Sequence, residues 1–196
     1  MQKLVSREQR EESILLSLKT LDYLTRSQLQ VLHDLGSVRN ASRVLKQMDD
    51  YVSSFRDGEN VYYLNSAGRE RVGCKKVRKK TLQARHYIMR NSLYIGYGCP
   101  QTWKNEQSFE VPKQVKVICD AYFVEDDQFH IVEVDHMQKM SVNRTKINKY
   151  RKLINLGVFD KPPVFIWITT TDYRRKQLEH LCIGLDVQIF TVSDFH

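Results

Sequence analysis

A short run of apolar and acidic residues, Phe129 to Asp135, limits most strongly what this chain can fold into. Its aromatic and β-branched side chains are typical of a half-buried strand. Because successive side chains of a strand point to opposite faces, Glu133 and Asp135 are expected on the same face. The run therefore predicts a buried strand that turns polar at one end and carries two neighbouring carboxylates there.

A third carboxylate, Asp120, interrupts a second strand-like run between Val115 and Phe123. If the two runs pair as a hairpin through residues 125–128, Asp120 approaches Glu133. Carboxylates that meet at the end of a sheet repel each other, and a hard divalent cation relieves that repulsion. Such clusters support metal-assisted phosphodiester chemistry. The simpler alternative is a set of strand-end carboxylates that face water.

The charge of the chain favours a polyanionic partner. The 196 residues include 31 Lys and Arg against 23 Asp and Glu, a net charge of +8, so nucleic acid is the first partner to consider. Residues 1–80 hold 16 basic and 10 acidic side chains, and residues 81–196 hold 15 and 13. The front part is therefore the better candidate for docking on phosphates.

The cysteines and the N-terminus indicate a cytoplasmic protein. Four cysteines are widely spaced and form no metal-binding pattern, as expected of reduced thiols. The charged N-terminus has no apolar signal core, and no apolar run is long enough to span a membrane. We therefore expect no membrane partner.

The first 72 residues have the element order of a winged helix-turn-helix domain. The apolar spacing predicts helices over residues 6–23, 26–32 and 38–51, with Ser6 and Thr25 as N-caps, and a hairpin from residues 52–55 and 60–64. The third helix of such a domain enters the major groove of DNA. The expected DNA contacts are Arg39, Arg43 and Lys46 on this helix and Arg56 in the wing. A solvated basic face and a protein-interaction module remain alternatives.

The rest of the chain predicts a short linker and a second domain. Residues 73–80 carry five basic side chains, of which Lys75 and Lys76 are further candidate DNA contacts. From residue 81 to 196 the elements run helix, strand, strand, strand, helix, strand, helix, strand. This order predicts a mixed sheet flanked by helices, in the α/β (α+β) class.

Four stretches carry a resemblance to a known family: residues 61–68 (Val-Tyr-Tyr-Leu-Asn-Ser-Ala-Gly), Asp120, residues 131–135 (Ile-Val-Glu-Val-Asp) and residues 146–150 (Lys-Ile-Asn-Lys-Tyr). With the order of the elements, the second domain resembles the PD-(D/E)XK restriction-endonuclease-like fold. The whole arrangement resembles the replication-relaxation family of plasmids and other mobile elements, and the MobC-type relaxases within it. The resemblance covers nearly the whole chain.

The resemblance implies metal binding and a nicking or relaxase-like activity on DNA. By position, Asp120 and Glu133 would bind Mg²⁺ or Mn²⁺, with Asp135 assisting. Cys119 stands where the family pattern has proline, and Asp135 stands where a nuclease has the lysine of its final motif. Lys146 is then the first candidate to supply that charge, ahead of Lys149 and Lys139. In the alternative interpretation, these lysines form a solvated face of the helix and take no part in catalysis.

The sequence leaves the function open between three classes. The first is a DNA-binding protein of a plasmid, phage or other mobile element, acting in replication, mobilisation or relaxation, with a metal-dependent nickase site. The second is a non-catalytic transcription or replication regulator with a degenerate nuclease-like domain. The third is an adaptor for an acidic protein. Double-stranded DNA is the expected partner in the first two classes, joined by other replication or mobilisation proteins, and the sequence also leaves a homodimer open.

Overall fold

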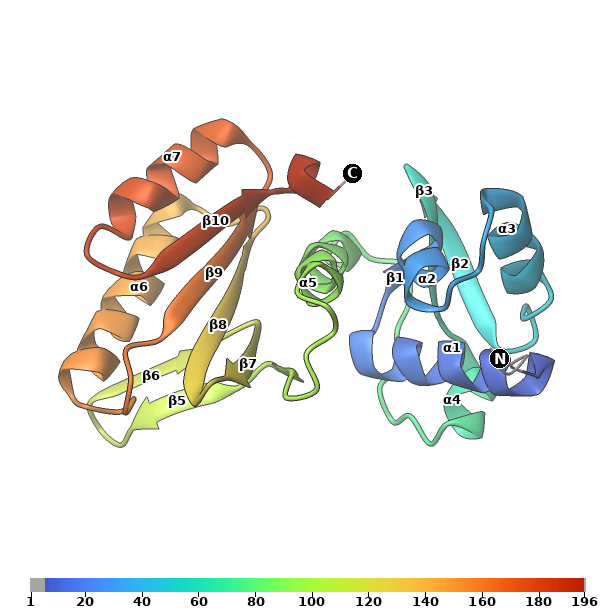
Figure 1. Cartoon of the computed structure of the whole chain (residues 1–196), viewed down its shortest axis with the longest axis horizontal. Coiled ribbons are helices and arrows are strands. Elements are labelled where there is room, and N and C mark those ends of the chain that lie inside the picture. Colours follow the sequence, from blue (N-terminus) through green and yellow to red (C-terminus); the bar gives the residue numbers. More distant parts are fainter. Residues whose placement is uncertain (1–5, 196) are drawn as a thin grey trace. The chain divides into compact units, whose positions relative to one another are not determined.

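The computed structural model describes residues 6–195, which form two compact units (Figure 1). The boundary between the units falls between Asn91 and Ser92, inside the helix α5 (Ala84–Gly96). Both units combine helices with sheet, and the second contains a mixed five-stranded sheet. The predicted α/β (α+β) class is therefore confirmed.

The first unit follows the predicted order of three helices and a hairpin. Its elements up to residue 71 are α1 (Arg7–Leu21), β1 (Leu24–Thr25), α2 (Arg26–Leu32), α3 (Val38–Lys46), β2 (Val52–Asp57), β3 (Glu59–Leu64) and α4 (Ser66–Arg71). The strands form one antiparallel sheet in the order β1-β3-β2. Ser6 and Thr25 each complete a capping box with a glutamine three residues later, which confirms both predicted helix starts.

The third helix is shorter than the sequence predicted. It ends at Lys46, and residues 47–51 form turns before β2 begins. Asp49 and Asp50 disfavour a longer helix, because they would place two carboxylates at its negative end. The hairpin turns at Gly58, which has a φ of +72° that a residue with a Cβ adopts at a cost.

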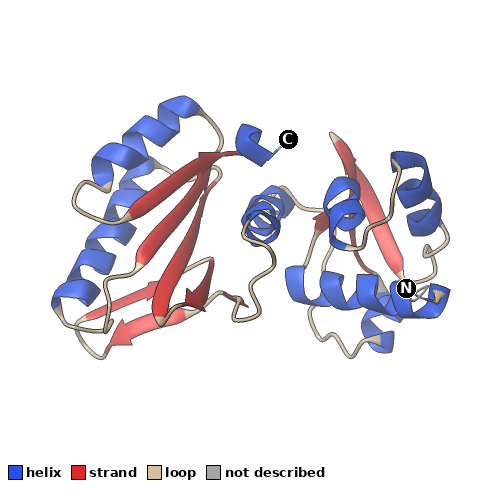
Figure 2. Ribbon diagram, in the orientation of Figure 1, coloured by secondary structure: helices blue, strands red, loops and turns tan. Residues whose placement is uncertain are grey.

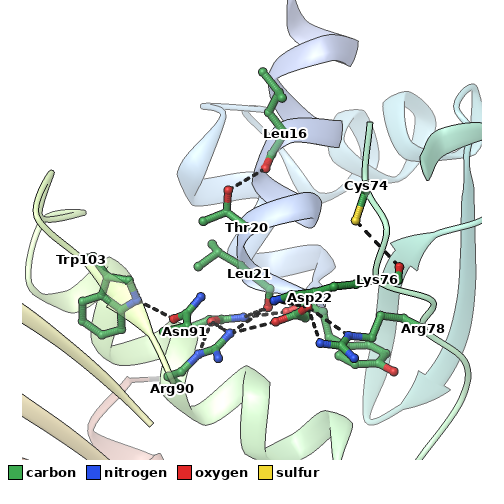
Figure 3. Close-up of polar contacts among 12 residues, drawn as sticks. Leu16, Thr20, Leu21, Asp22, Cys74, Lys76, Arg78, Arg90, Asn91 and Trp103 are labelled. Carbon is green, nitrogen blue, oxygen red and sulfur yellow. Dashed lines mark hydrogen bonds and ion pairs between the residues drawn. The ribbon is translucent and has the colours of Figure 1, made fainter. Parts of the chain in front are cut away.

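The basic segment after residue 72 packs on the first unit through the buried carboxylate of Asp22 (Figure 3). Arg78 donates to Asp22 Oδ1 from Nε at 2.9 Å and from Nη2 at 2.7 Å, and Lys76 Nζ lies 3.4 Å from the same oxygen. Tyr23 donates its hydroxyl proton to the carbonyl of Lys79 at 2.8 Å. Residues 73–80, expected to be a linker, are thus attached to the first unit.

The middle of α5 contacts the same end of α1 through Arg90 and Asn91. Arg90, which is 1% exposed, reaches Asp22 Oδ2 at 3.5 Å and the carbonyl of Leu21 at 3.2 Å. Asn91 donates to the carbonyls of Leu21 and Tyr23 at 2.9 and 2.7 Å. These bonds satisfy backbone groups that the end of α1 leaves without helical partners. They explain why the first unit extends to Asn91, beyond the predicted boundary.

The second unit is built on the sheet β10-β9-β8-β7-β4, with β5 and β6 as a separate pair (Figure 2). After α5 its elements are β4 (Lys104–Asn105), β5 (Ser108–Val111), β6 (Val115–Ile118), β7 (Ala121–Glu125), β8 (Gln128–Asp135), α6 (Met140–Asn155), β9 (Val164–Thr169), α7 (Asp172–Leu181), β10 (Val187–Thr191) and the 3-10 turn η1 (Val192–Phe195). β7 and β8 are antiparallel, whereas β8, β9 and β10 are parallel.

The second strand-like run of the sequence divides into two strands at Asp120. β6 pairs with β5, and β7 pairs with β8 in the larger sheet. The backbone N–H of Cys119 bonds to the carbonyl of Gln107, while that of Asp120 bonds to the carbonyl of Val132. The chain changes partner at this residue pair. The polar residue Asp120 marked the interruption in the sequence, but the apolar pattern did not show that the two halves pair with different strands.

One face of the larger sheet is covered by α6 and α7. The core between them includes Ile131, Trp167, Ile147, Tyr150 and Leu178, all at most 2% exposed. β9 is buried along its whole length, and its apolar residues 164–168 suit a central strand covered on both faces. Between residues 6 and 195, none of the helices has both the length and the apolar character that crossing a membrane requires.

We predict that Asp22→Asn destabilises the first unit by about 3 kcal/mol, because Arg90 would keep its buried charge without a carboxylate. The matched control is Asp34→Asn, an exposed aspartate that also has a positive φ. Urea unfolding followed by circular dichroism reports both units. Tryptophan fluorescence reports the second, which contains Trp103 and Trp167. An unchanged circular dichroism transition in Asp22→Asn would contradict the prediction.

Candidate functional site

Glu133 lies at the centre of the second unit and is fully buried. It sits on β8 opposite Trp167 of β9, on the face that α6 covers. Lys146 of α6 forms an ion pair with its Oε2, and Tyr150 donates a hydrogen bond to its Oε1. Both oxygens of this carboxylate are thus bound by side chains from one face of α6.

Asp120 approaches Glu133 as the predicted hairpin required. Its Oδ2 accepts a hydrogen bond from the backbone N–H of Val134 at 2.7 Å. Its negative charge also acts on Glu133 and on Lys146 and raises the pKa of both groups. The structure therefore brings together Asp120, Glu133 and Lys146, three of the four predicted catalytic residues.

Burial and charge act in opposite directions within this cluster. Burial raises the pKa of Glu133 well above its usual range, and Lys146 opposes that effect. Burial alone would lower the pKa of Lys146, but Glu133 and Asp120 raise it above its usual value. Lys146 therefore keeps its proton and acts as a fixed positive charge. Burial also raises the pKa of the Cys119 thiol to about 12, so this cysteine is not a nucleophile at neutral pH.

Asp135 lies on the same face of β8 as Glu133 but binds a different set of groups. Arg174 of α7 donates to both carboxylate oxygens, at 2.6 and 2.7 Å. Thr169 donates to Oδ2 at 2.6 Å, and Asn143 donates to Oδ1 at 2.8 Å. Burial alone would raise the pKa of Asp135, but these donors, Arg174 foremost, hold it below its usual value. Asp135 is thus a buried anion with its own arginine.

The carboxylates in this arrangement do not fit a divalent cation. Mg²⁺ and Mn²⁺ need carboxylate oxygens that are free to coordinate them. The oxygens of Glu133 and of Asp135 are already bound by donors within the protein. Within the described part of the chain, no group of three or more His, Cys, Asp and Glu is placed to hold a metal ion. The Lys146 ammonium supplies the positive charge at Glu133 instead.

Two residues of the site, Tyr150 and Arg174, are not among the site residues predicted from the sequence. Tyr150 lies four residues after Lys146 and therefore on the same face of the helix. That spacing was a usable signal. Arg174 lies 39 residues after Asp135, and only the packing of α7 brings them together. No local pattern in the sequence predicts such a pair.

In the first unit, the predicted DNA contacts on α3 are exposed. Arg39, Arg43 and Lys46 follow one another at spacings of four and three residues, which places them on one face of the helix. Arg43 donates to the side chain of Asn40 at 2.7 Å. Among residues 6–195, no carboxylate forms an ion pair with any of these three side chains.

The other predicted DNA contacts differ among themselves. Arg56 on β2 is exposed and borders a hollow of about 420 Å³, together with Lys80 and Arg85. Lys75 is exposed, but Lys76 is drawn to Asp22. Of the predicted DNA contacts, those on α3, Arg56 and Lys75 are thus exposed to solvent. Lys76 instead forms an ion pair within the first unit.

Comparisons with known proteins agree with the family resemblance. The family described as Replication-relaxation matches residues 15–166, which confirms the resemblance drawn from the sequence. No curated protein sequence matches the chain. Among solved structures, the chain is similar to the crystal structure of protein VC1899 from Vibrio cholerae, with 12% sequence identity and a TM-score of 0.41. The similarity covers 92% of this chain and 52% of that protein.

We predict that Lys146→Met destabilises the second unit and that the loss grows as the pH rises. Without the ammonium, burial keeps Glu133 protonated in the folded state. The unfolded chain releases that proton above a pKa of about 4.3. Because the folded state then binds more protons, stability falls with rising pH, by up to about 1.4 kcal/mol per pH unit.

The measurement is urea unfolding followed by tryptophan fluorescence at pH 5 and pH 8. Lys149→Met is the matched control, because Lys149 is an exposed lysine one turn along the same helix. A loss of stability that is equal at both pH values would show that Lys146 does not compensate a buried carboxylate.

Proposed function

The chain belongs to the replication-relaxation family, and on that premise we propose that it is a DNA-binding protein acting in the replication, mobilisation or relaxation of a plasmid, phage or other mobile element. In this proposal the first unit is a winged helix-turn-helix domain that docks on double-stranded DNA. The second unit is a nuclease-like domain without metal-dependent activity.

The observation that carries the proposal is the row of Arg39, Arg43 and Lys46 on α3. Several other basic side chains of the first unit are compensated, since Arg26, Arg71, Arg78 and Arg85 form ion pairs with carboxylates. The α3 row has no such carboxylate among the described residues, so its charge is directed at solvent. An uncompensated basic row on one helix face is complementary to a phosphate backbone.

The position of the row in the fold supports the same partner. α3 is the third helix of the unit and is followed by the β2–β3 hairpin. In winged helix-turn-helix proteins the corresponding helix enters the major groove. Arg56 on the hairpin would then contact the backbone beside it. An acidic protein partner also suits a basic surface, and the salt dependence of DNA binding separates the two.

We predict that Arg39→Gln combined with Arg43→Gln lowers the affinity for duplex DNA at least about tenfold. Losing two phosphate contacts should also reduce the slope of log affinity against log salt by about 1.8. Fluorescence anisotropy with a labelled duplex over a salt series measures both quantities. The control is Arg7→Gln with Arg69→Gln, which removes two charges from α1 and α4. An equal loss of DNA affinity in the two double variants would show that α3 is not the contact surface.

A second candidate function, a metal-dependent nickase, is favoured by the meeting of Asp120, Glu133 and Lys146. Two carboxylates at the end of a hairpin and a lysine from the neighbouring helix are the residue types that the nuclease chemistry needs. For that function, Lys146 and Tyr150 would first have to release the oxygens of Glu133. This requirement is why we place the nickase second.

We predict that the wild-type protein does not nick supercoiled plasmid in the presence of Mn²⁺ or Mg²⁺, because Glu133 is bound within the protein. The assay should include Asp120→Asn and, as a control, Asp160→Asn, which changes an exposed carboxylate away from the cluster. Metal-dependent nicking that is lost in Asp120→Asn and kept in Asp160→Asn would establish the nickase and contradict this prediction.

A further inference from the structure

A groove in the second unit runs between α6 and the hairpin of β5 and β6. We propose that this groove, here called the α6 groove, binds the sugar–phosphate backbone of a single DNA strand. The proposal extends the proposed function and rests on it in taking DNA as the ligand. It concerns a surface separate from the α3 row, so the two can be tested independently.

The groove consists of two adjoining hollows of about 620 and 550 Å³. Lys116, Thr145 and Lys149 line both hollows, so the two lie side by side along α6 and the hairpin. The second one ends at Lys146, the lysine that binds Glu133. The groove therefore leads from the tip of the hairpin to the cluster of buried carboxylates.

Positive charge dominates the lining. Lys113, Lys116, Lys149 and Lys152 line the first hollow, in which Glu110 is the acidic residue. Glu110 is paired with Lys116 at 2.9 Å, which leaves a clear excess of positive charge. A groove walled by one sign of charge concentrates the opposite charge, and phosphates are the recurrent charge of a nucleic-acid strand.

The lysines divide into bound and available ones. Lys152 donates to the carbonyl of Gln114 at 3.1 Å, and this bond joins α6 to the hairpin. Lys113 and Lys149 are exposed, and no carboxylate among residues 6–195 pairs with them. Lys113 is at the tip of the hairpin and Lys149 is on the helix, so the two walls each offer one available ammonium.

The rest of the lining suits a sugar–phosphate chain. Thr145 and Asn148 lie on the same face of α6 as Lys149 and Lys152, and both can donate hydrogen bonds to phosphate oxygens. Near Lys146 the groove has the exposed apolar side chains of Ile118 and Val142. These can contact the sugar or the base that accompanies each phosphate.

A single strand fits this surface better than a duplex does. The groove is open, and near Lys146 it presents the exposed apolar side chains of Ile118 and Val142, which can contact the unstacked bases of a single strand. A duplex keeps the faces of its bases stacked inside, so it cannot offer them to these side chains. We therefore take the single strand as the ligand of the α6 groove.

The test uses the full chain with Lys113→Gln and Lys149→Gln combined. A labelled mixed-sequence single-stranded oligonucleotide and its duplex are titrated by fluorescence anisotropy over a salt series. We expect the affinity for the single strand to fall at least about tenfold, and the slope of log affinity against log salt to decrease by about 1.4. The control is Lys104→Gln with Lys176→Gln, which removes two exposed lysines outside the groove.

Each other outcome has a defined meaning. An unchanged single-strand affinity in the groove variant overturns the proposal, and so does an equal loss in the control. Failure of the wild type to bind the single strand also overturns it and leaves an acidic protein as the partner to examine. Duplex binding by the Arg39→Gln and Arg43→Gln variant is measured in parallel. If that variant binds duplex DNA with normal affinity while the groove variant loses affinity for the single strand, α3 is not the duplex contact and the proposal for the α6 groove is supported.

Discussion

The arrangement of the second unit depends on a carboxylate that is buried without access to water. Glu133 is fully enclosed, and an ionised carboxylate in such a place is very costly unless a counter-charge and hydrogen bonds compensate it. Lys146 and Tyr150 provide both from one side of α6. This requirement fixes the rotation of α6 above the sheet, and the same rotation turns Thr145 and Lys149 toward the α6 groove.

The first unit also contains a buried carboxylate, and its charge is compensated by residues from further along the chain. Asp22 is buried where α1 ends, and its partners Arg78 and Arg90 arrive from the basic segment and from α5. Removing one partner from such a pair is more costly than the pair itself is stabilising. The ion pairs of Asp22 therefore specify which segment packs at the end of α1. One of the paired arginines, Arg78, comes from a stretch whose composition resembles that of a linker.

The parts of the fold that depend on neighbouring residues could be predicted, and those that depend on distant partners could not. The starts of α1 and α2 follow from Ser6 and Thr25, and the approach of Asp120 to Glu133 follows from hairpin pairing. The division of β6 from β7 requires knowing that Gln107 and Val132 are the backbone partners on either side of Asp120. The pairing of Asp135 with Arg174 requires the position of α7. Neither leaves a local pattern.

Glu133 and Asp135 show why alternation along a strand does not define a shared metal site. Both point to the face that the helices cover, yet Lys146 binds one and Arg174 binds the other. Two of the three predicted metal ligands, Glu133 and Asp135, are thus occupied by cations of the protein itself, and the third, Asp120, accepts a backbone N–H. Among the described residues, positive charge without a carboxylate partner includes the α3 row and the available lysines of the α6 groove. Buried acids bound within the protein and exposed bases without such partners support the proposal that the protein holds a polyanion rather than cutting one with a metal.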